Sequence, residues 1–394
     1  MTKREYFKVA TFAMLAFLIF ILIFLFTAGP TFIDIIAHRK YSTPGIKITP
    51  EVEAFHRTLW VADMHSDAML WRRNFLARNN YGHVDLPRMQ EGSMALQFFT
   101  SPTKTPFFLN YDRNGSDSDM ITALMMMQHN PVKTWFSLVE RAIMHSRRLH
   151  DYAKNSKDVF FVIHSKAELA QFIEKKKANP SLAAGIMGLE GAHALEGDLN
   201  NIERLYREGF RMLAPVHFFD NSLGGSAHGL EKKGLTESGR RFVLEANRKD
   251  IIIDLSHASE MLIDDVLAIS VKPVVLSHTG VKATCPNGRN ISDKHARLIG
   301  QKNGLIGIAF FSQATCGKDI ASIVRAIKKA VELAGVDHVA LGSDFDGVVR
   351  TPIDAAGMKY LTAALLESGM NRESVRKIMG GNTLRFLQKN LPVR

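Results

Sequence analysis

The chain has 394 residues, of which 46% are hydrophobic and 23% charged, a balance typical of a folded protein with a large core rather than a disordered one. Its formal charge of +11 comes from scattered basic residues, with no zinc-finger spacing, RNP-like aromatic pattern or glycine-rich phosphate loop beside them. Nucleic-acid binding is therefore not expected, and two cysteines are too few for a disulfide scaffold or a cysteine-rich zinc site.

An apolar stretch near the N-terminus, residues 9–28, contains twenty residues without a charge. At about 1.5 Å per residue in a helix, it is long enough to cross the hydrocarbon core of a bilayer. A cleaved signal peptide usually has a shorter apolar region and small residues before the cut, whereas Phe26 would be third-last before a cut after Ala28. We therefore expect residues 1–28 to form a cytoplasmic tip and a single-pass transmembrane signal anchor, with membrane lipid around residues 9–28.

Basic residues on both sides of this stretch bear on its orientation. Lys3, Arg4 and Lys8 precede it and hold the N-terminus in the cytoplasm under the positive-inside rule. The basic pair Arg39 and Lys40 follows it and weakens this argument. The rest of the chain is expected outside the cytoplasm, in the periplasm or the extracellular space.

Residues 29–50 contain three prolines and two glycines, which predict a linker. The globular body is then expected to occupy residues 51–394. Within it, short apolar runs alternate with helical patterns. The expected strands are 59–65, 94–99, 184–190, 211–217, 251–257, 273–278, 304–310 and 338–344, and the expected helices are 118–150, 166–178, 199–208, 233–248, 259–269, 319–334 and 353–368.

Eight strands alternating with helices are typical of the α/β class and of a closed (β/α)8 TIM barrel in particular. A ninth apolar run at residues 159–164 is interpreted as a peripheral strand, because no plausible site residue follows it. An open doubly wound sheet would need a nucleotide-binding fingerprint after its first strand, and none is present.

Polar residues with metal-binding side chains stand at the ends of six of these strands. They are His65 and Asp67, Glu190, His217, His257, His278 and Asp344. Because strand side chains alternate, residues two apart, such as the first pair, project to the same side. Imidazole and carboxylate are the ligands that zinc prefers. Each residue alone has an ordinary structural explanation as a cap, a turn former or a hydrogen-bonded core residue, but their shared position favours a metal site at the carboxyl end of the barrel.

The motifs around these positions resemble those of the membrane (renal-type) dipeptidases, zinc-dependent (β/α)8 barrels related to the amidohydrolases. The matching motifs are HSD at 65–67, GLEG around Glu190, VH ending at His217, DLSH ending at His257, LSH ending at His278, GRN around Arg289 and GSDFDG around Asp344. Two longer stretches, 83–99 and 380–387, add to the resemblance, which spans about residues 51 to 390.

The resemblance implies two zinc ions per chain, bridged by the Glu190 carboxylate. His65 and Asp67 would complete the first site, and His257 and His278 the second. The general chemistry of two-metal sites agrees, because two ions about 3.5–4 Å apart need a shared anionic ligand. A water between them would then lose a proton near neutral pH and give a bridging hydroxide.

The same resemblance implies roles for three further residues in the hydrolysis of dipeptides. His217 would bind the substrate, polarise its peptide carbonyl and stabilise the tetrahedral oxyanion. Arg289 would pair with the C-terminal carboxylate of the substrate, as a planar guanidinium can do with two hydrogen bonds. Asp344 would take a proton from the attacking water and deliver it to the leaving amine.

The two cysteines, Cys285 and Cys316, follow adjacent expected strands and would lie on the same face of a barrel. They would pair if the domain lies outside the cytoplasm and would stay as free thiols if it lies inside.

We therefore expect a membrane-anchored zinc dipeptidase. One alternative is another amidohydrolase-type enzyme, such as a deaminase or a phosphotriesterase-like hydrolase, but these typically begin with His-x-His and often use a modified lysine as the bridge, unlike Asp67 and Glu190 here. A second alternative is a catalytically dead, membrane-tethered binding barrel. The sequence does not determine the oligomeric state, and a homodimer is among the states it allows.

Overall fold

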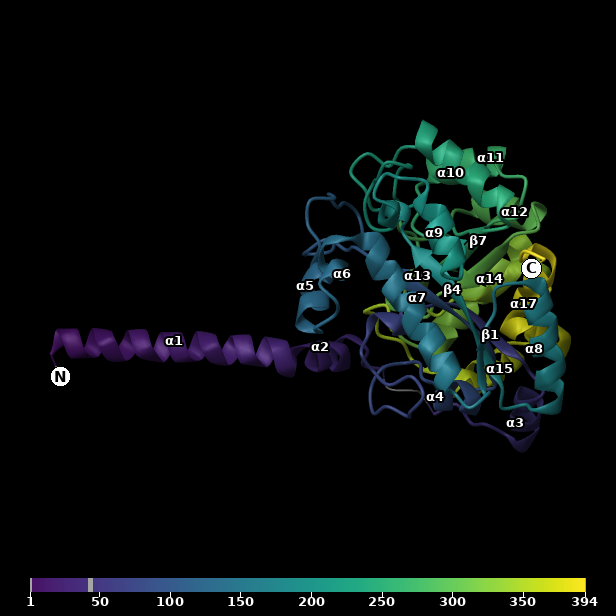
Figure 1. Cartoon of the computed structure of the whole chain (residues 1–394). Helices are drawn as coiled ribbons and strands as arrows, with labels where there is room; N and C mark the ends of the chain where they lie inside the picture. The colour runs from purple at the N-terminus through teal and green to yellow at the C-terminus, as the bar shows by residue number, and fades with distance from the viewer. Residues whose placement is uncertain (1, 42–44, 394) are drawn as a thin grey trace.

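A parallel sheet lies at the centre of the computed structural model, which describes residues 2–41 and 45–393 (Figure 1). Its eight main strands are β1 (Val61–Ser66), β2 (Met94–Pro102), β4 (Ala183–Glu190), β5 (Phe210–Leu213), β6 (Ile252–Ile253), β7 (Val275–Thr279), β8 (Leu305–Ile308) and β9 (Val339–Leu341). Each strand except β6 pairs with the next in this order, and β1 also pairs with β9. A parallel bridge between Asp254 and Val275 joins the remaining neighbours, β6 and β7, so the strands follow one another around a ring in chain order.

All eight predicted strands are confirmed, with somewhat different bounds. The predicted peripheral strand is confirmed as β3 (Phe160–Val162), which pairs with β4 outside the ring. Every residue of β2 and β4 is buried, as expected for parallel strands that are covered on both faces. The arrangement agrees with the predicted (β/α)8 architecture.

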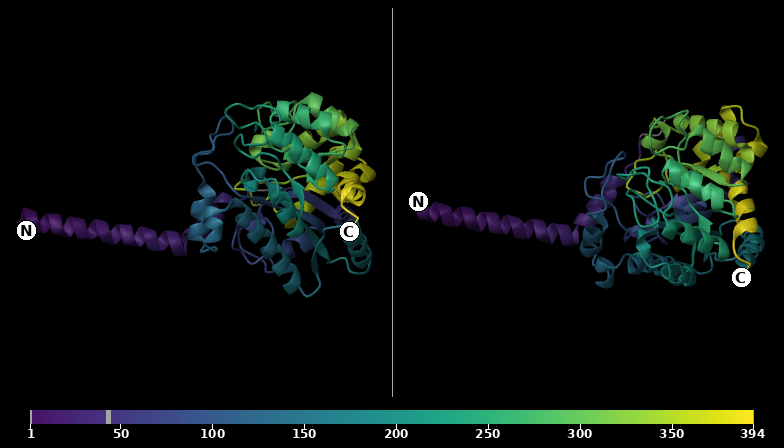
Figure 2. Two further views of the ribbon diagram at one scale, coloured as in Figure 1. Left: turned by 45° about the horizontal axis from the view of Figure 1, so that its top comes forward. Right: turned by 90° about the horizontal axis from the view of Figure 1, so that it is seen from above.

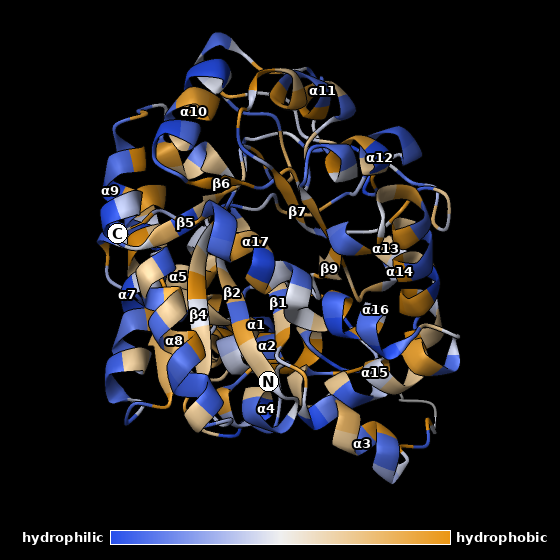
Figure 3. Ribbon diagram, turned by 90° about the vertical axis from the view of Figure 1, so that its right-hand side faces the viewer, coloured by the Kyte–Doolittle hydropathy of each residue, from blue (hydrophilic) through white to orange (hydrophobic). Residues whose placement is uncertain are grey.

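Helices surround the sheet, and many of those that cover it place apolar residues inward and charged residues outward (Figure 3). Those that cover the barrel are α7 (Leu138–Asn155), α8 (Lys166–Ala178), α9 (Asn201–Arg207), α10 (Glu237–Arg248), α11 (Glu260–Ile269), α12 (Asp293–Gln301), α14 (Ile320–Ala334), α15 (Met358–Glu367) and α17 (Asn382–Asn390). Shorter helices are α3 (Pro50–Arg57), α4 (Leu86–Glu91), α13 (Ser312–Thr315) and α16 (Arg372–Arg376), and short helical turns occur at Ala68–Leu70, Ala192–Leu195, Val336–His338, Ala355–Gly357 and Lys377–Gly381.

The prediction of one long helix over residues 118–150 is wrong. The structure has three helices there: α5 (Met120–Met127), α6 (Lys133–Phe136) and α7. Pro131 lacks a backbone N–H and cannot continue a helix, so α5 ends before it. Ser137 then caps the N-terminus of α7, because its side chain accepts a hydrogen bond from the backbone N–H of Glu140.

The N-terminal apolar stretch forms α1 (Lys3–Thr27), a helix that projects from the body (Figures 1 and 2). None of its residues is buried, and its length of about 37 Å exceeds the thickness of a bilayer core. By length and composition α1 is a candidate membrane span, a test that a signal sequence near an N-terminus also passes.

The stretch expected as a linker, residues 29–50, begins with a helix that packs against the body, α2 (Gly29–Ala37). Its proline lies in the first helical turn, where a missing N–H has no effect. Asp34 and His38 are buried, and their side chains contact each other at 2.7 Å. The Nε2 atom of His38 accepts a hydrogen bond from the backbone N–H of Val348, in the loop after β9. The beginning of the expected linker is therefore part of the folded body, and residues 42–44 of it lie outside the described residues.

Arg73 is the residue that joins α2 to the loop after β9. Its guanidinium lies 3.1 Å from the Asp34 carboxylate and 2.8 Å from the carboxylate of Asp346, and all three side chains are buried. Burial alone would raise the pKa of Asp346, but the positive charge of Arg73 holds that pKa well below its usual range. The three groups form one buried ionic cluster, in which Arg73 neutralises two acids.

We expect the substitution Arg73→Met to lower the free energy of unfolding by about 3–5 kcal/mol, because it leaves two buried carboxylates without their cation. Denaturation of the full chain in detergent measures this. The matched control is Arg57→Met, which removes an exposed pair with Glu53 and should change the free energy by less than about 1 kcal/mol. Equal losses in the two variants would contradict the importance of the cluster.

Candidate metal centre

The carboxyl ends of the strands bring together the eight side chains that the sequence singled out. They are His65, Asp67, Glu190, His217, His257, His278, Arg289 and Asp344, and all are buried. All of them except His65 line one cavity of about 330 Å³, and His65 contacts Glu190. Residues that are up to 279 positions apart in the sequence (65 to 344) therefore share one small volume.

Glu190, the last residue of β4, lies at the centre of this group. Four imidazoles point their Nε2 atoms at its carboxylate, at distances of 3.4 Å for His65, 3.4 Å for His217, 3.3 Å for His257 and 3.5 Å for His278. Gly191 follows with φ of 91°, and a Cβ there would lie 2.3 Å from the ring of His193. The glycine after Glu190 in the GLEG motif therefore lets the chain turn away without displacing the carboxylate.

Two further carboxylates stand on the β1 and β9 side of the site. Asp67 and Asp344 lie 3.7 Å and 3.9 Å from the Nε2 atom of His65. Thr100 donates a hydrogen bond of 2.6 Å to Asp67. The backbone of Asp344 is left-handed, with φ of 62°, and a Cβ on Gly347 would lie 2.1 Å from its carboxylate. The glycine of the DFDG sequence thus leaves the space that Asp344 occupies.

The electrostatics of the site disfavour the ionised carboxylates as long as no cation is present. Burial, followed by the negative charge of Asp254, raises the pKa of Glu190 to about 8. Burial and the charge of Glu190 raise the pKa values of Asp67 and Asp344 well above their usual range. Burial lowers the pKa values of the four surrounding histidines, which keeps them neutral. Neutral imidazoles beside carboxylates that need positive charge fit a site for divalent metal ions.

Two of the histidines are oriented by one hydroxyl group. Ser277 donates its hydroxyl hydrogen to Asp254 at 2.5 Å, and its oxygen lies 2.9 Å from Nδ1 of His65 and 3.0 Å from Nδ1 of His278. That oxygen can accept from both Nδ1–H groups, which leaves the Nε2 lone pairs free to face the centre. The Nε2 atom of His65 has no hydrogen-bond partner among the described residues, as expected of an atom that awaits a metal.

The geometry does not by itself divide the ligands between two ions. Three sets of side chains have ligand atoms within 4.8 Å of one another: His65 with Glu190 and His278, Glu190 with His217 and His257, and His65 with Asp67 and Asp344. Two of the sets contain Glu190, in agreement with a shared carboxylate. The predicted division into a first site with Asp67 and a second site with His257 stays a prediction.

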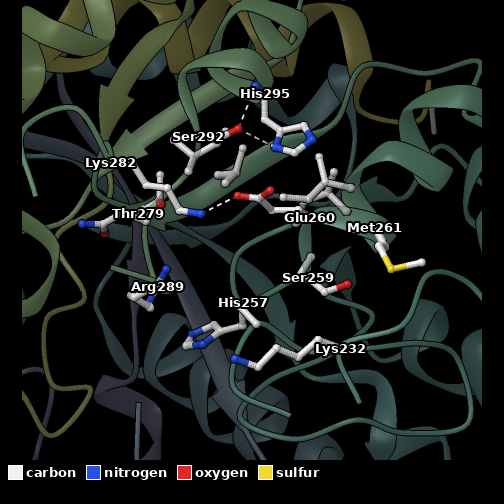
Figure 4. Close-up of a pocket in the computed structure, with 18 residues that line it drawn as sticks. Lys232, His257, Ser259, Glu260, Met261, Thr279, Lys282, Arg289, Ser292 and His295 are labelled. Atoms are coloured by element: carbon white, nitrogen blue, oxygen red, sulfur yellow. Dashed lines mark hydrogen bonds and ion pairs between the residues drawn. The ribbon is translucent and has the colours of Figure 1, made fainter. Parts of the chain in front are cut away.

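Arg289 presents an unpaired guanidinium to the cavity. Its NH2 group donates to the backbone oxygen of His278 at 2.8 Å, while its Nε and NH1 groups have no partner among the described residues. Figure 4 shows a second cavity of about 270 Å³, also lined by Arg289 and His257, with an ion pair between Glu260 and Lys282. Arg289 therefore borders both spaces and has donors available for an anionic ligand.

Two residues at the site, Tyr111 and His228, were missed by the sequence analysis. Tyr111 lines the main cavity, and burial, with the charge of Asp344, raises its pKa to about 12. The Nδ1 atom of His228 lies 2.5 Å from the backbone oxygen of Tyr111, and its ring centre lies 5.1 Å from that of His257. Both residues lie in irregular loops, where no periodic pattern marks them, although the Gly-Gly-Ser-Ala-His-Gly run at 224–229 could have drawn attention to His228.

A disulfide joins Cys285 and Cys316, with their Cα atoms 5.3 Å apart. The sequence had left their pairing open. The bond links the loop after β7, which carries Arg289, to the segment after β8. Asn290 adds hydrogen bonds to the backbone oxygens of Cys285 and Ala314, at 2.8 Å and 3.0 Å. The loop that presents Arg289 is therefore held at both ends.

Comparison with known proteins identifies relatives over most of the chain. A family model described as membrane dipeptidase (peptidase family M19) matches residues 50–392. Dipeptidase tcpJ of Claviceps purpurea is 30% identical over 319 residues, covering 78% of this chain and 69% of the relative. Dipeptidase aclJ of Aspergillus oryzae is 28% identical over 351 residues, covering 83% and 77%.

Solved structures of metallopeptidases also superpose on most of the chain. The metallopeptidase described as dipeptidase AC, of family M19, superposes with a TM-score of 0.70 at 26% identity, covering 85% of this chain and 99% of that one. A metallopeptidase from Rhodobacter sphaeroides, liganded with a phosphinate mimic of L-Ala-D-Ala, gives a TM-score of 0.67 at 26% identity, covering 84% and 99%.

We expect Ser277→Ala to weaken the binding of a divalent metal ion such as Zn²⁺ by about 10–100-fold, because it frees the rings of two candidate ligands, His65 and His278, at once. Competition against a chromophoric chelator measures the affinity. The control Ser181→Ala changes an exposed serine far from the site and should leave the affinity unchanged. A Ser277→Ala protein that binds zinc as tightly as the parent would show that this hydroxyl does not orient the ligands.

Proposed function

Since the chain belongs to the membrane dipeptidase family, peptidase family M19, and is thus a metal-dependent peptide hydrolase, we propose that it is a membrane-anchored zinc dipeptidase. The observation that carries this proposal is the convergence of four imidazoles and three carboxylates beside an unpaired guanidinium in one buried cavity. The imidazoles and carboxylates suit metal ions, and the guanidinium suits the free carboxylate of a peptide.

Two Zn²⁺ ions per chain would be held by five residues. Glu190 would bridge them, with His65 and Asp67 on one side and His257 and His278 on the other. When bound, the ions would lower the pKa of a shared water and so supply the nucleophile at neutral pH. The high pKa that burial gives Glu190 supports this assignment, because a cation on each side would restore its ionised form.

Arg289 would limit the substrate to dipeptides. Its guanidinium donates to the backbone of the ligand residue His278, so a carboxylate that pairs with its remaining N–H groups lies close to the metal ligands. A substrate held in this way would have one amino-acid residue between that carboxylate and the scissile bond at the metal centre. The peptide bond that is cut would therefore be the one before the C-terminal residue.

His217 and Asp344 would act on the reacting groups. His217 is neutral and has an Nδ1 atom without a partner among the described residues, which suits a role in polarising the carbonyl and stabilising the oxyanion. The raised pKa of Asp344 suits a group that accepts a proton from water and passes it to the leaving amine. Asp346 is unsuited to this task, because its carboxylate already pairs with Arg73 and accepts from the backbone of His83.

The domain at residues 51–394 would lie outside the cytoplasm, anchored by lipid around residues 9–28. The disulfide between Cys285 and Cys316 supports this, because such bonds persist in oxidising compartments. Substrates with a D-residue in second position are worth testing beside L,L-dipeptides, since a relative of known structure holds a mimic of L-Ala-D-Ala.

The full chain, purified in detergent, should contain two zinc ions and hydrolyse dipeptides in a chelator-sensitive manner. Zinc is counted by mass spectrometry, and L,L- and L,D-dipeptides are screened with and without chelator. Nucleosides and phosphotriesters in the same screen test the other amidohydrolase activities. Fewer than one zinc per chain, together with no chelator-sensitive hydrolysis, would overturn the proposal.

Asp344→Asn should lower kcat by about 10²–10⁴-fold, because the amide cannot carry the proton. Zinc content, measured on the same sample, should stay at the level of the parent protein. Asp151→Asn, at an exposed helix position, serves as the matched control and should keep full activity. Unchanged hydrolysis in Asp344→Asn would exclude it as the proton carrier, and no hydrolysis even in the parent would favour the inactive binding barrel.

A further inference from the structure

The apolar helix α1 meets the body at one particular place. Phe26, near its C-terminal end, stacks on His129 with ring centres 6.1 Å apart, and Phe24 contacts Phe32 of α2 at 5.9 Å. His129 follows Gln128, the residue that caps the C-terminal end of α5. Figures 1 and 2 show α5, α6 and the loop before them on the side of the body from which α1 projects. The end of α1 and the segment at residues 103–136 therefore lie at the same level along the helix axis.

This segment, residues 103–136, concentrates the exposed apolar side chains of the body. Among the described residues beyond residue 40, twelve large apolar residues are exposed, and six of them belong to this segment. They are Phe107, Phe108, Leu109, Met120, Val132 and Phe136, of which Phe108 is 99% and Phe136 78% exposed. The other six are scattered over the remaining body. Such a concentration is unusual on a surface that faces only water.

The inner side of the segment is fixed to the body by polar contacts. The buried Arg141 of α7 donates to Asp119 at 2.9 Å and to Thr122 at 2.8 Å. The Asn114 side chain donates to the backbone oxygens of Phe218, at 3.1 Å, and His228, at 3.2 Å. Hydrogen bonds therefore hold the segment to the body, and its exposed apolar side chains point outward from an ordered backbone.

We propose that residues 103–136 rest on the bilayer surface around α1, with Phe107, Phe108 and Phe136 inserted at the boundary between headgroups and acyl chains. The proposal rests on the membrane anchoring proposed above. Apolar and aromatic side chains beside a span insert at this depth and hold the body against the membrane.

The contact would place the mouth of the catalytic cavity at the membrane surface. Ile33 of α2, Leu109 and Met120 line that cavity together with the metal-binding residues, so the lipid-facing segment is also one wall of the site. Substrate would enter from the water layer next to the headgroups.

Spin labels on introduced cysteines test this in the full chain, reconstituted at one chain per lipid nanodisc. Both native cysteines are in the disulfide, so each introduced cysteine is the only free thiol. Labels replace Phe108, Phe136, Phe17 in the middle of α1, and Val271, an 83% exposed residue in the loop before β7 that serves as the aqueous control. Collisions with oxygen, which concentrates in lipid, and with a water-soluble nickel complex are measured at each position.

We expect the ratio of oxygen to nickel collisions to be several-fold higher for Phe108→Cys and Phe136→Cys than for Val271→Cys, and highest for Phe17→Cys. A lipid-like ratio at 17 with water-like ratios at 108 and 136 would overturn the surface proposal and leave the anchor intact. A water-like ratio at 17 would overturn the anchor and the surface proposal together. Low collision rates with both agents at 108 and 136 would mean that protein covers the segment, a second copy for example, and would also refute lipid contact.

Discussion

The buried carboxylate of Glu190, which faces four imidazoles, is the constraint on which the rest of the site depends. An ionised carboxylate in a dry site is unfavourable unless positive charge surrounds it, and neutral histidines do not supply that charge. A second buried carboxylate nearby, that of Asp67, increases the need for positive charge at the site. Much of the surrounding architecture keeps this arrangement in place: Ser277 orients two rings from behind, Thr100 fixes Asp67, and Gly191 lets the chain leave without a collision. The fold thus holds three buried carboxyl groups whose ionised forms the binding of cations would stabilise.

The sequence predicted which side chains come together here, because a barrel places the carboxyl ends of its strands, and the residues that follow them, at one end. His65 and Asp67 share one side because strand side chains alternate, and strands that follow one another in the chain are also neighbours in the ring. The features of the site that the sequence did not predict depend on contacts between segments that are distant in the chain. The partnership of Ser277 with Asp254, the approach of Tyr111 to the cavity and the docking of α2 all arise from tertiary packing, which leaves no periodic trace in the sequence. The single expected helix over 118–150 failed for a local reason, a proline followed by a serine cap.

Two acidic residues, Asp63 just before the HSD motif and Asp346 within the GSDFDG motif, have structural roles that their spacing in the sequence does not reveal. Asp63 lies two residues before His65 and accepts hydrogen bonds from the backbone and side chain of Ser343 and from Gln97, which ties β1 to its neighbours on both sides. Asp346 lies two residues after Asp344 but pairs with Arg73. What separates a candidate catalytic acid from a structural one here is the partner that each carboxylate meets.

Under the membrane anchoring proposed above, the docking of α2 would give α1 a fixed attachment to the body. A flexible tether would let the enzyme tumble, so that its active site would sample every direction above the bilayer. Here the ionic contacts of Asp34 and the hydrogen bond between His38 and the backbone of Val348, whose φ of 59° is rare for a β-branched residue, fasten α2 to the loop that carries Asp344. Attached in this way, the enzyme could not rotate freely about its anchor. Its active site would keep one orientation relative to the membrane and to the molecules that diffuse along its surface.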